Sequence, residues 1–394
     1  MADNQREMER REKRAKKDNR NKKIIWIIIA VIVVVLAVMK IFEININSVK
    51  NHFTDENGDF TFTQGVTEDN YPYSIDASKN VRIVNINNKL GIMTPSSFTV
   101  LNNKTADTQY VFEHGYSNPI LDTAGYYSLV YDQGAKSYRL DTTSNLVYEK
   151  ETDNSLLCAC AAKNGNVAYA TTSKEKLCDI IIVSKELKEE FRISTSDGYV
   201  IALSLTDNGK KLAVATLTGE NANLKITVSV YDVKTAQVQN SVVLPQGTLL
   251  DMRFAGSNII VIGDSYAGCI KKDEYSDIFE PDSISTQAIT YTPSGDVVLA
   301  YNSYSNSTDN AVVYIKKNGA IKSAAKVTGN VKSVTASSSL VTVLTNNEII
   351  SFNLSNGEEK ERLTIDDSAK SVCRMGAEVF VHKQSIVDRI EAVE

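Results

Sequence analysis

The chain has 394 residues, with 43 Lys and Arg, 48 Asp and Glu, and five Cys. Without the eleven basic and six acidic residues of segment 1–43, the remaining 32 basic and 42 acidic residues carry a net charge of about −10, which argues against nucleic acid or an anionic polymer as a partner. Five scattered cysteines in a chain of this length exclude a disulfide framework.

A basic segment, residues 1–23, opens the chain and contains ten Lys or Arg against five acidic residues. An unbroken apolar run from Ile24 to Met39 follows, and its extension to residues 24–42 comes close to the roughly 20 residues that cross a hydrocarbon core. Trp26, the only Trp of the chain, lies near the inner boundary of the run, where an amphipathic indole is favoured. We predict one transmembrane helix over 24–42, with the N-terminus cytoplasmic by the positive-inside rule.

A cleaved secretory signal is the alternative interpretation, because a basic start and an apolar core are also typical of signal peptides. However, the apolar run is long for such a signal, and Met39–Glu43 contains no small-x-small cleavage site. The first cysteine, Cys158, lies too far along the chain for a lipoprotein signal. We therefore predict an uncleaved anchor that leaves the rest of the chain outside the cytoplasm.

Residues 43–58 are predicted to form a short stalk. Within it, Asp55–Asp59 places oxygens at alternate positions, as calcium loops do, but the glycine and glutamate that such loops need later are missing. We interpret this stretch as a turn. Residues 59–65 then alternate apolar and polar side chains, which indicates a strand and marks the start of an exported domain over 59–394.

This domain repeats apolar and β-branched runs of four to eight residues, separated by turns rich in Gly, Asn, Asp and Ser, which is an all-β pattern. One half-unit, Val200–Thr216, consists of a strand, the turn Thr206–Lys210 and a second strand. A four-strand unit with a period of about 37 to 50 residues is typical of propeller blades. Units that start near residues 81, 120, 157, 199, 249, 287, 331 and 370 predict a β-propeller of eight blades, with seven as the alternative.

The last of these units has room for only about three strands. Because an unpaired edge strand invites aggregation, a ring of blades needs its two ends joined. We therefore predict that the N-terminal strand 59–65 completes the last blade and closes the propeller.

Two stretches of the fourth unit resemble known bacterial propeller repeats. Leu203–Thr216 contains a strand, a Thr-Asp-Asn-Gly turn and a strand, and Tyr231–Leu244 contains an Asp-x-x-Thr turn. Both resemble the TolB-like and quinoprotein-like (PQQ-like, BamB-like) superfamilies, although the blades lack the Trp of quinoprotein repeats and the Trp-Asp dipeptide of WD40 repeats. Over nearly its full length the chain is similar to a family of Gram-positive, clostridial-type membrane proteins with one N-terminal span and an exported propeller. The resemblance implies a WD40/YVTN-like ring and names no activity.

An acidic segment, Lys271–Asp282, shows no strand signal and is longer than a hairpin needs, so we predict a loop. Long loops on a rigid β scaffold are where binding surfaces tend to lie, and two aromatic residues expected to be partly exposed favour an interaction site. A solvated insertion is the alternative. The candidate partner-binding residues are Asp273, Glu274, Tyr275, Asp277, Phe279 and Glu280.

Residues that could carry chemistry are sparse. The three histidines, His52, His114 and His382, are far apart in the sequence; a closed ring would bring the last two near each other, and solvated loop histidines are the alternative. Cys158 and Cys178 fall in one unit and could form a single bridge, the alternative being buried free thiols. We recognise no catalytic, metal-ligand or cofactor pattern and expect no cofactor.

The sequence thus predicts a single-pass protein of the cell membrane that displays an all-β propeller outside the cytoplasm. We expect a non-enzymatic module that binds or scaffolds a protein partner of the cell envelope, or an envelope polymer. The alternative is an exported hydrolase or lyase that acts on glycan or peptide, with polar residues gathered at the channel of the ring.

Overall fold

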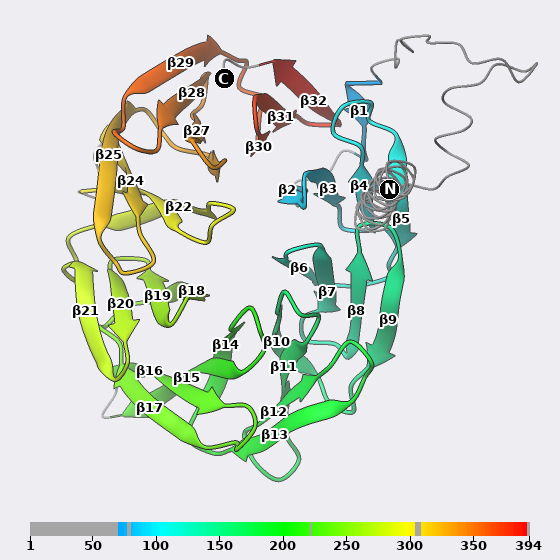
Figure 1. Cartoon of the computed structure of the whole chain (residues 1–394), viewed down its shortest axis with the longest axis vertical. Helices are drawn as coiled ribbons and strands as arrows, with labels where there is room; N and C mark the ends of the chain where they lie inside the picture. The colour runs from blue at the N-terminus through cyan, green and yellow to red at the C-terminus, as the bar shows by residue number, and fades with distance from the viewer. Residues whose placement is uncertain (1–69, 77–79, 221–222, 304–308, 392–394) are drawn as a thin grey trace, which may run out of the picture. The chain divides into compact units, whose positions relative to one another are not determined.

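The computed structural model describes residues 70–76, 80–220, 223–303 and 309–391. In this part of the chain all regular structure is β, and the strands form eight four-stranded antiparallel sheets. The sheets follow one another around a ring (Figure 1). The predicted propeller with eight blades is confirmed, and the seven-bladed alternative is wrong. The predicted tail, transmembrane helix, stalk and strand 59–65 all lie outside the described residues.

In blades 1 to 7 the strands follow chain order from the innermost to the outermost strand (Figure 1). Blade 1 contains β2 (Arg82–Ile86), β3 (Lys89–Met93), β4 (Ser97–Leu101) and β5 (Thr108–Glu113). Blade 2 contains β6 (Pro119–Ala124), β7 (Tyr127–Asp132), β8 (Ser137–Thr142) and β9 (Leu146–Glu151). Blade 3 contains β10 (Leu156–Ala161), β11 (Val167–Thr172), β12 (Cys178–Val183) and β13 (Glu189–Thr195). Blade 4 contains β14 (Tyr199–Leu205), β15 (Lys211–Glu220), β16 (Asn223–Asp232) and β17 (Val238–Val243).

The second half of the ring repeats this order. Blade 5 contains β18 (Leu249–Ala255), β19 (Asn258–Gly263), β20 (Ala267–Lys271) and β21 (Glu274–Phe279). Blade 6 contains β22 (Ser285–Tyr291), β23 (Val297–Asn302), β24 (Asp309–Ile315) and β25 (Ile321–Thr328). Blade 7 contains β26 (Ser333–Ala336), β27 (Leu340–Leu344), β28 (Glu348–Asn353) and β29 (Glu359–Thr364). Blade 8 contains β30 (Ser371–Met375), β31 (Glu378–His382), β32 (Ile386–Glu391) and β1 (Tyr73–Ser74).

Each innermost strand begins within two residues of the start predicted from the repeat. The turns explain this agreement, because residues that tolerate positive φ angles set the strand ends. In the two-residue turn between β2 and β3, Asn87 and Asn88 have φ angles of 49° and 61°, which fits a type I′ hairpin. Gly209, with a φ angle of 69°, provides the positive φ angle in the turn between β14 and β15.

The hydrophobic core consists of eight clusters, one between each pair of neighbouring blades. The middle strands are buried on both faces, and all five residues of β27 are buried, so their sequence reads as continuous apolar runs. Outer strands such as β25 alternate exposed and half-buried residues. Blade packing therefore joins the ring through side chains, because strand pairing stays within each blade.

The ring is closed at blade 8 by a strand from the N-terminal side of the domain. β1 pairs with β32 in the register Tyr73 to Val387 and Ser74 to Ile386. The Tyr71 ring packs on Phe380, with 5.4 Å between the ring centroids. β1 thus takes the position in the last blade that we predicted for residues 59–65.

The prediction that Lys271–Asp282 forms a loop is wrong. Residues 274–279 form β21, which pairs with β20 as the outermost strand of blade 5. The sequence signal was weak because an outermost strand has no apolar run of its own, and acidic residues on its exposed side hide the alternation. The turn before it is tight, with Lys272 at a φ angle of 55°.

The possible disulfide bridge is excluded as well. Cys158 lies on β10 and Cys178 on β12, with β11 between them. Two inter-strand spacings, about 9.5 Å, exceed the roughly 7 Å that a disulfide can span between Cα atoms. All five cysteines are buried and free.

Among the described residues, no helix has the length and apolar character required to cross a membrane.

Candidate functional site

The innermost strands have one edge that faces the axis of the ring and pairs with no other strand (Figure 1). Backbone polar groups on such an edge need other partners. Side chains of the neighbouring blade provide them: Ala161 N donates to Asp122 Oδ2 at 2.9 Å, and Arg82 Nη1 donates to Leu121 O at 2.8 Å. Later blades repeat this with Phe254 N to Ser204 Oγ, Val372 N to Ser333 Oγ and Arg374 N to Thr335 Oγ1. Side-chain hydrogen bonds therefore tie the inner strands together.

Five polar side chains from four blades meet at this axis, and we call them the axial cluster: Arg82 (β2), Asp122 (β6), Asp251 and Arg253 (β18), and Tyr291 (β22). Arg253 Nη2 donates to Asp122 Oδ1 at 3.2 Å, which joins blade 5 directly to blade 2. The Arg253 guanidinium lies 4.5 Å from the centroid of the Tyr291 ring, and Tyr291 Oη donates to Asp251 Oδ2 at 2.7 Å. The cluster thus connects blades that do not pack against each other.

Burial and neighbouring charges shift the pKa values of the arginines and of Tyr291 in the axial cluster. Burial lowers the pKa of Arg82; the carboxylate of Asp122 opposes this effect, and the positive charge of Arg253 adds to it. For Arg253, burial is the largest single effect and lowers the pKa, but Asp122, Tyr291 and Asp251 together outweigh it, so the pKa of that guanidinium is raised. Burial and Asp251 raise the pKa of Tyr291 well above its usual value. At neutral pH the cluster therefore contains two guanidinium cations and a neutral phenol, whose O–H group donates a hydrogen bond to Asp251.

The carboxylate oxygens of the cluster are already in use. Asp122 accepts from Arg253 and from Ala161 N, and Asp251 accepts from Tyr291 and from Met252 N. These hydrogen bonds link β6 to β10 and to β18, and β18 to β22, so the two carboxylates hold inner strands of different blades together.

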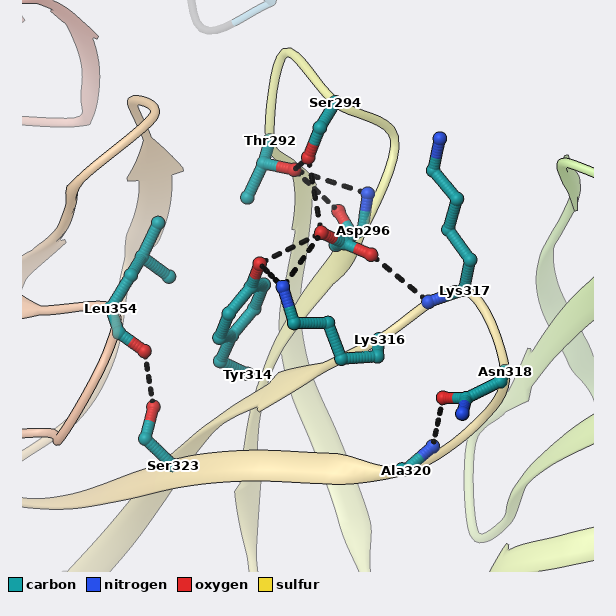
Figure 2. A network of polar contacts seen from close by, with 10 residues as sticks. All are labelled: Thr292, Ser294, Asp296, Tyr314, Lys316, Lys317, Asn318, Ala320, Ser323 and Leu354. Carbon is teal, nitrogen blue, oxygen red and sulfur yellow. Dashed lines mark hydrogen bonds and ion pairs between the residues drawn. The ribbon is translucent and has the colours of Figure 1, made fainter.

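A second polar network lies in the turns of blade 6 (Figure 2). The buried Asp296, between β22 and β23, accepts hydrogen bonds from Tyr314 Oη at 2.7 Å and from Lys317 N at 2.9 Å. Ser294 Oγ donates to the same carboxylate at 3.0 Å. Lys316 Nζ lies 2.6 Å from Tyr314 Oη and 3.4 Å from Asp296 Oδ2. The carboxylate thus pins the first turn of the blade to its third turn.

The grouping of Tyr314, Lys316 and Asp296 resembles a proton relay, but its pKa shifts do not suit one. Burial raises the pKa of Tyr314 above its usual value. Burial alone would raise the pKa of Asp296 as well, yet the hydrogen bonds from Tyr314 and Lys317 lower it. Efficient acid–base catalysis needs a pKa near the working pH. The two shifts move both pKa values further from 7, and the hydrogen bonds of Asp296 hold the two turns of the blade together.

Most candidate partner-binding residues lie on β21, and their aromatic members face inward. The Tyr275 ring lies against Gly268, where a Cβ atom would overlap it, and its hydroxyl is buried. The Phe279 ring packs on Tyr301, with 4.7 Å between centroids. Tyr275 therefore fixes the strand to its own blade, and Phe279 fixes it to β23 of blade 6. The acidic residues stay exposed at the rim of blade 5: Asp273, Glu274, Asp277 and Glu280.

The two histidines of the blades are not solvated loop residues. His382 ends β31 and is 1% exposed, and neither ring nitrogen has a partner among the described residues. Burial, and then the charge of Lys370, lowers its pKa. His114 is half-buried, its ring 5.1 Å from that of Tyr116, and burial lowers its pKa too. Neither histidine is a member of the axial cluster.

An aromatic stripe along blade 1 was missed in the sequence. Its side chains alternate along the outermost strand and its extension, and neighbouring rings lie 5.1 to 6.2 Å apart: Tyr110, Phe112, His114 and Tyr116. Arg139 of blade 2 lies 4.0 Å from the Phe112 ring centroid and pairs with the buried Asp141 at 2.9 Å. Four aromatic residues at a period of two could have revealed an inter-blade strand face.

Four exposed apolar side chains lie on strands at one end of blades 4 and 5. We call this end the linker face, because it carries the links between blades and the turns between second and third strands. Tyr199 pairs with Leu217 and Leu217 with Ile226, and Leu224 lies two residues before Ile226 on β16, so its side chain points to the same side. The exposed fractions are 56% for Tyr199, 36% for Ile201, 63% for Leu224 and 50% for Leu250. We call these four residues the apolar patch.

The geometry of the described residues offers no cluster of three or more His, Cys, Asp or Glu side chains that could hold a metal ion. No curated protein matches the chain. Among solved structures it is similar to the C-terminal WD40 domain of Sif2, at 10% identity and a TM-score of 0.58, and to Saccharomyces cerevisiae Sqt1, at 8% and 0.54. Each alignment covers 82% of this chain and 97% of the other, and at such identities the likeness shows the fold alone.

A family model matches residues 60–391, which include every strand of the described ring. The chain therefore belongs to DUF5711, a family of unknown function.

Proposed function

We propose that the chain is a membrane-anchored protein whose propeller binds a protein partner outside the cytoplasm. The apolar patch carries this proposal. Contiguous apolar surface on a soluble domain is a common feature of protein interfaces, and a half-exposed Tyr among aliphatic side chains is typical of a binding hot spot. The resemblance to single-span membrane proteins with an exported propeller supports the anchor.

The position of the patch fits a docking surface on a rigid support. β15 and β16 have ten residues each and extend three residue pairs beyond the pairing of β14 with β15. Leu224 lies on this extension, and Leu250 lies on β18, which belongs to the next blade around the ring (Figure 1). On the inner side, Leu217 and Leu249 pack against the core cluster between blades 4 and 5. Tyr199 and Leu224 therefore lie on the side of blade 4 that carries this core cluster.

Photo-crosslinking tests this proposal. A photoreactive phenylalanine analogue at position 199 of the full chain, irradiated in intact cells, is expected to give a defined protein adduct. Position 126 is the matched control, because Tyr126 is 45% exposed but lies in the turn between the first and second strands of blade 2, at the opposite end of the ring. The adduct at 199 should disappear in a Leu224→Ser, Leu250→Ser background. Equal adducts at 199 and 126 would remove the basis of the proposal.

The proposed topology has its own test. Residues 24–42 would place the propeller outside if the basic tail stays in the cytoplasm. In cells with the wall removed, an epitope tag at the C-terminus is expected to bind antibody without permeabilisation, and a tag at the N-terminus only after it. Staining of the N-terminal tag alone would refute the orientation and leave the apolar patch unaffected.

The exposed acidic residues of β21 are proposed as a second contact at the rim of the same blade. The half-buried Tyr275 and Phe279 would contribute by holding the strand in place, so we do not expect them to contact a partner directly.

A further inference from the structure

Two guanidinium groups of the axial cluster converge on one short stretch of backbone. Arg82 comes from blade 1 and donates to Leu121 O at 2.8 Å, and Arg253 comes from blade 5 and donates to the next residue, Asp122 Oδ1, at 3.2 Å. Both groups therefore lie beside β6 at the axis. The Arg82 side chain is exposed to solvent, and that of Arg253 is 36% exposed, so a small ligand can reach them.

The cluster has more donors than acceptors. A guanidinium carries five N–H groups, and Arg82 and Arg253 each donate a single hydrogen bond to the described residues. The four carboxylate oxygens of Asp122 and Asp251 all accept hydrogen bonds already. The remaining N–H groups of both arginines are thus without a protein acceptor in the part of the chain that the structure describes.

The two arginines differ in their carboxylate partners. Arg253 has Asp122 within ion-pair distance and Asp251 at 3.9 Å. Arg82 forms no ion pair with any described residue, and the carboxylates of Asp122 and Asp251 act on its charge only at longer range. A planar, bidentate oxyanion is the partner that guanidinium groups match best.

We propose that Arg82 and Arg253 bind the oxyanion of a small ligand, a carboxylate or a phosphate group, on the axis of the propeller. The site is distinct from the apolar patch and does not depend on the proposed protein partner. Arg82 would bind the ligand with its free N–H groups, and Arg253, held by Asp122 and by the face of Tyr291, would supply the second guanidinium. The cation–π contact keeps Arg253 in place without using its hydrogen-bond donors.

Calorimetric titration of the full chain at constant ionic strength tests this inference, with inorganic phosphate and succinate as separate probes. Saturable binding of either anion is expected, and the stronger of the two identifies the ligand class. Arg82→Gln should weaken binding by about tenfold or more, the loss of one charge-assisted bidentate contact. Arg362→Gln is the matched control, because Arg362 is paired with Glu348 and Glu359 on blade 7, and it should bind like the wild type.

The substitution Asp122→Asn should change the affinity for the anion in the opposite direction to Arg82→Gln. The amide oxygen can still accept from Ala161 N, but the negative charge beside Arg253 is gone, so anion binding should become severalfold tighter. This variant keeps the test decisive if Arg82→Gln fails to fold. Absence of saturable binding by both anions, or unchanged binding in both axial variants, would overturn the proposal.

Discussion

His382 is a buried side chain whose two ring nitrogens have no partner among the described residues. Such a group is tolerated while it is neutral, because a neutral imidazole loses less solvation on burial than a charged one. Its pKa in the folded protein is lowered from the usual 6.5 by burial and by Lys370. The unfolded chain therefore binds a proton at a higher pH than the folded chain does.

This difference predicts an acid-sensitive fold. Because the unfolded state takes up the proton first, the free energy of unfolding should fall as the pH drops below about 6.5 and level off below the lowered pKa of the folded state. His382→Leu removes the proton site, so the loss of stability between pH 7.5 and 5.5 should be smaller in the variant. Urea denaturation midpoints at both pH values measure the effect, and values at pH 8.5, where the histidine is neutral in both states, serve as the control. An unchanged pH dependence would assign the acid sensitivity to other groups.

At the scale of the element, strand β1 closes the ring although it is very short. It consists of two residues, yet it supplies the fourth strand of blade 8. The residues around it strengthen the closure, because Tyr71 packs on Phe380 and lies under the guanidinium of Arg389, 5.3 Å from its ring centroid. The closure thus depends more on side-chain packing than on the pairing of the two strands.

Tyr71→Ala should accordingly destabilise the seam of the ring. Loss of a half-buried aromatic side chain with one ring contact and one cation–π contact is expected to lower the free energy of unfolding by about 2 kcal/mol. Chemical denaturation measures the change, and amide hydrogen exchange should accelerate in β31 and β32 while β15 and β16 on the far blade remain protected. Tyr199→Ala is the control for loss of an exposed tyrosine and should change stability little. Exchange that accelerates equally in both blades would show that closure is not local to the seam.

The elements that could be predicted from the sequence are those whose own residues determine them. The inner strand starts were located because the Asn and Gly turns and the apolar middle strands are local signals. β21 was missed because its structure depends on pairing with β20 and on packing against the ring of Tyr301. Neither contact can be recognised from the residues of the acidic segment itself. β1 was missed because two residues show no alternation, and residues 59–65 do.

At the scale of the whole molecule, the ring and its eight blades followed from the repeat, since a period of four strands has few other architectures. The axial cluster did not follow from it. Arg82, Asp122 and Arg253 lie in ordinary strands, and nothing in their spacing indicates that blades 1, 2 and 5 bring them together. The apolar patch was equally hidden, because Tyr199 and Leu224 are typical strand residues until their exposure is known.

The contact of Arg253 with Asp122 has a consequence for how the ring moves. A propeller in which each blade touches only its two neighbours behaves as a closed one-dimensional array, and a disturbance in one blade reaches a distant blade only through every blade between them. The hydrogen bond from blade 5 to blade 2 connects two blades that are not neighbours in this array. Blades 2 and 5 share no packed surface, but this bond couples them directly. A conformational change in one of them can therefore affect the other without passing through the blades between them.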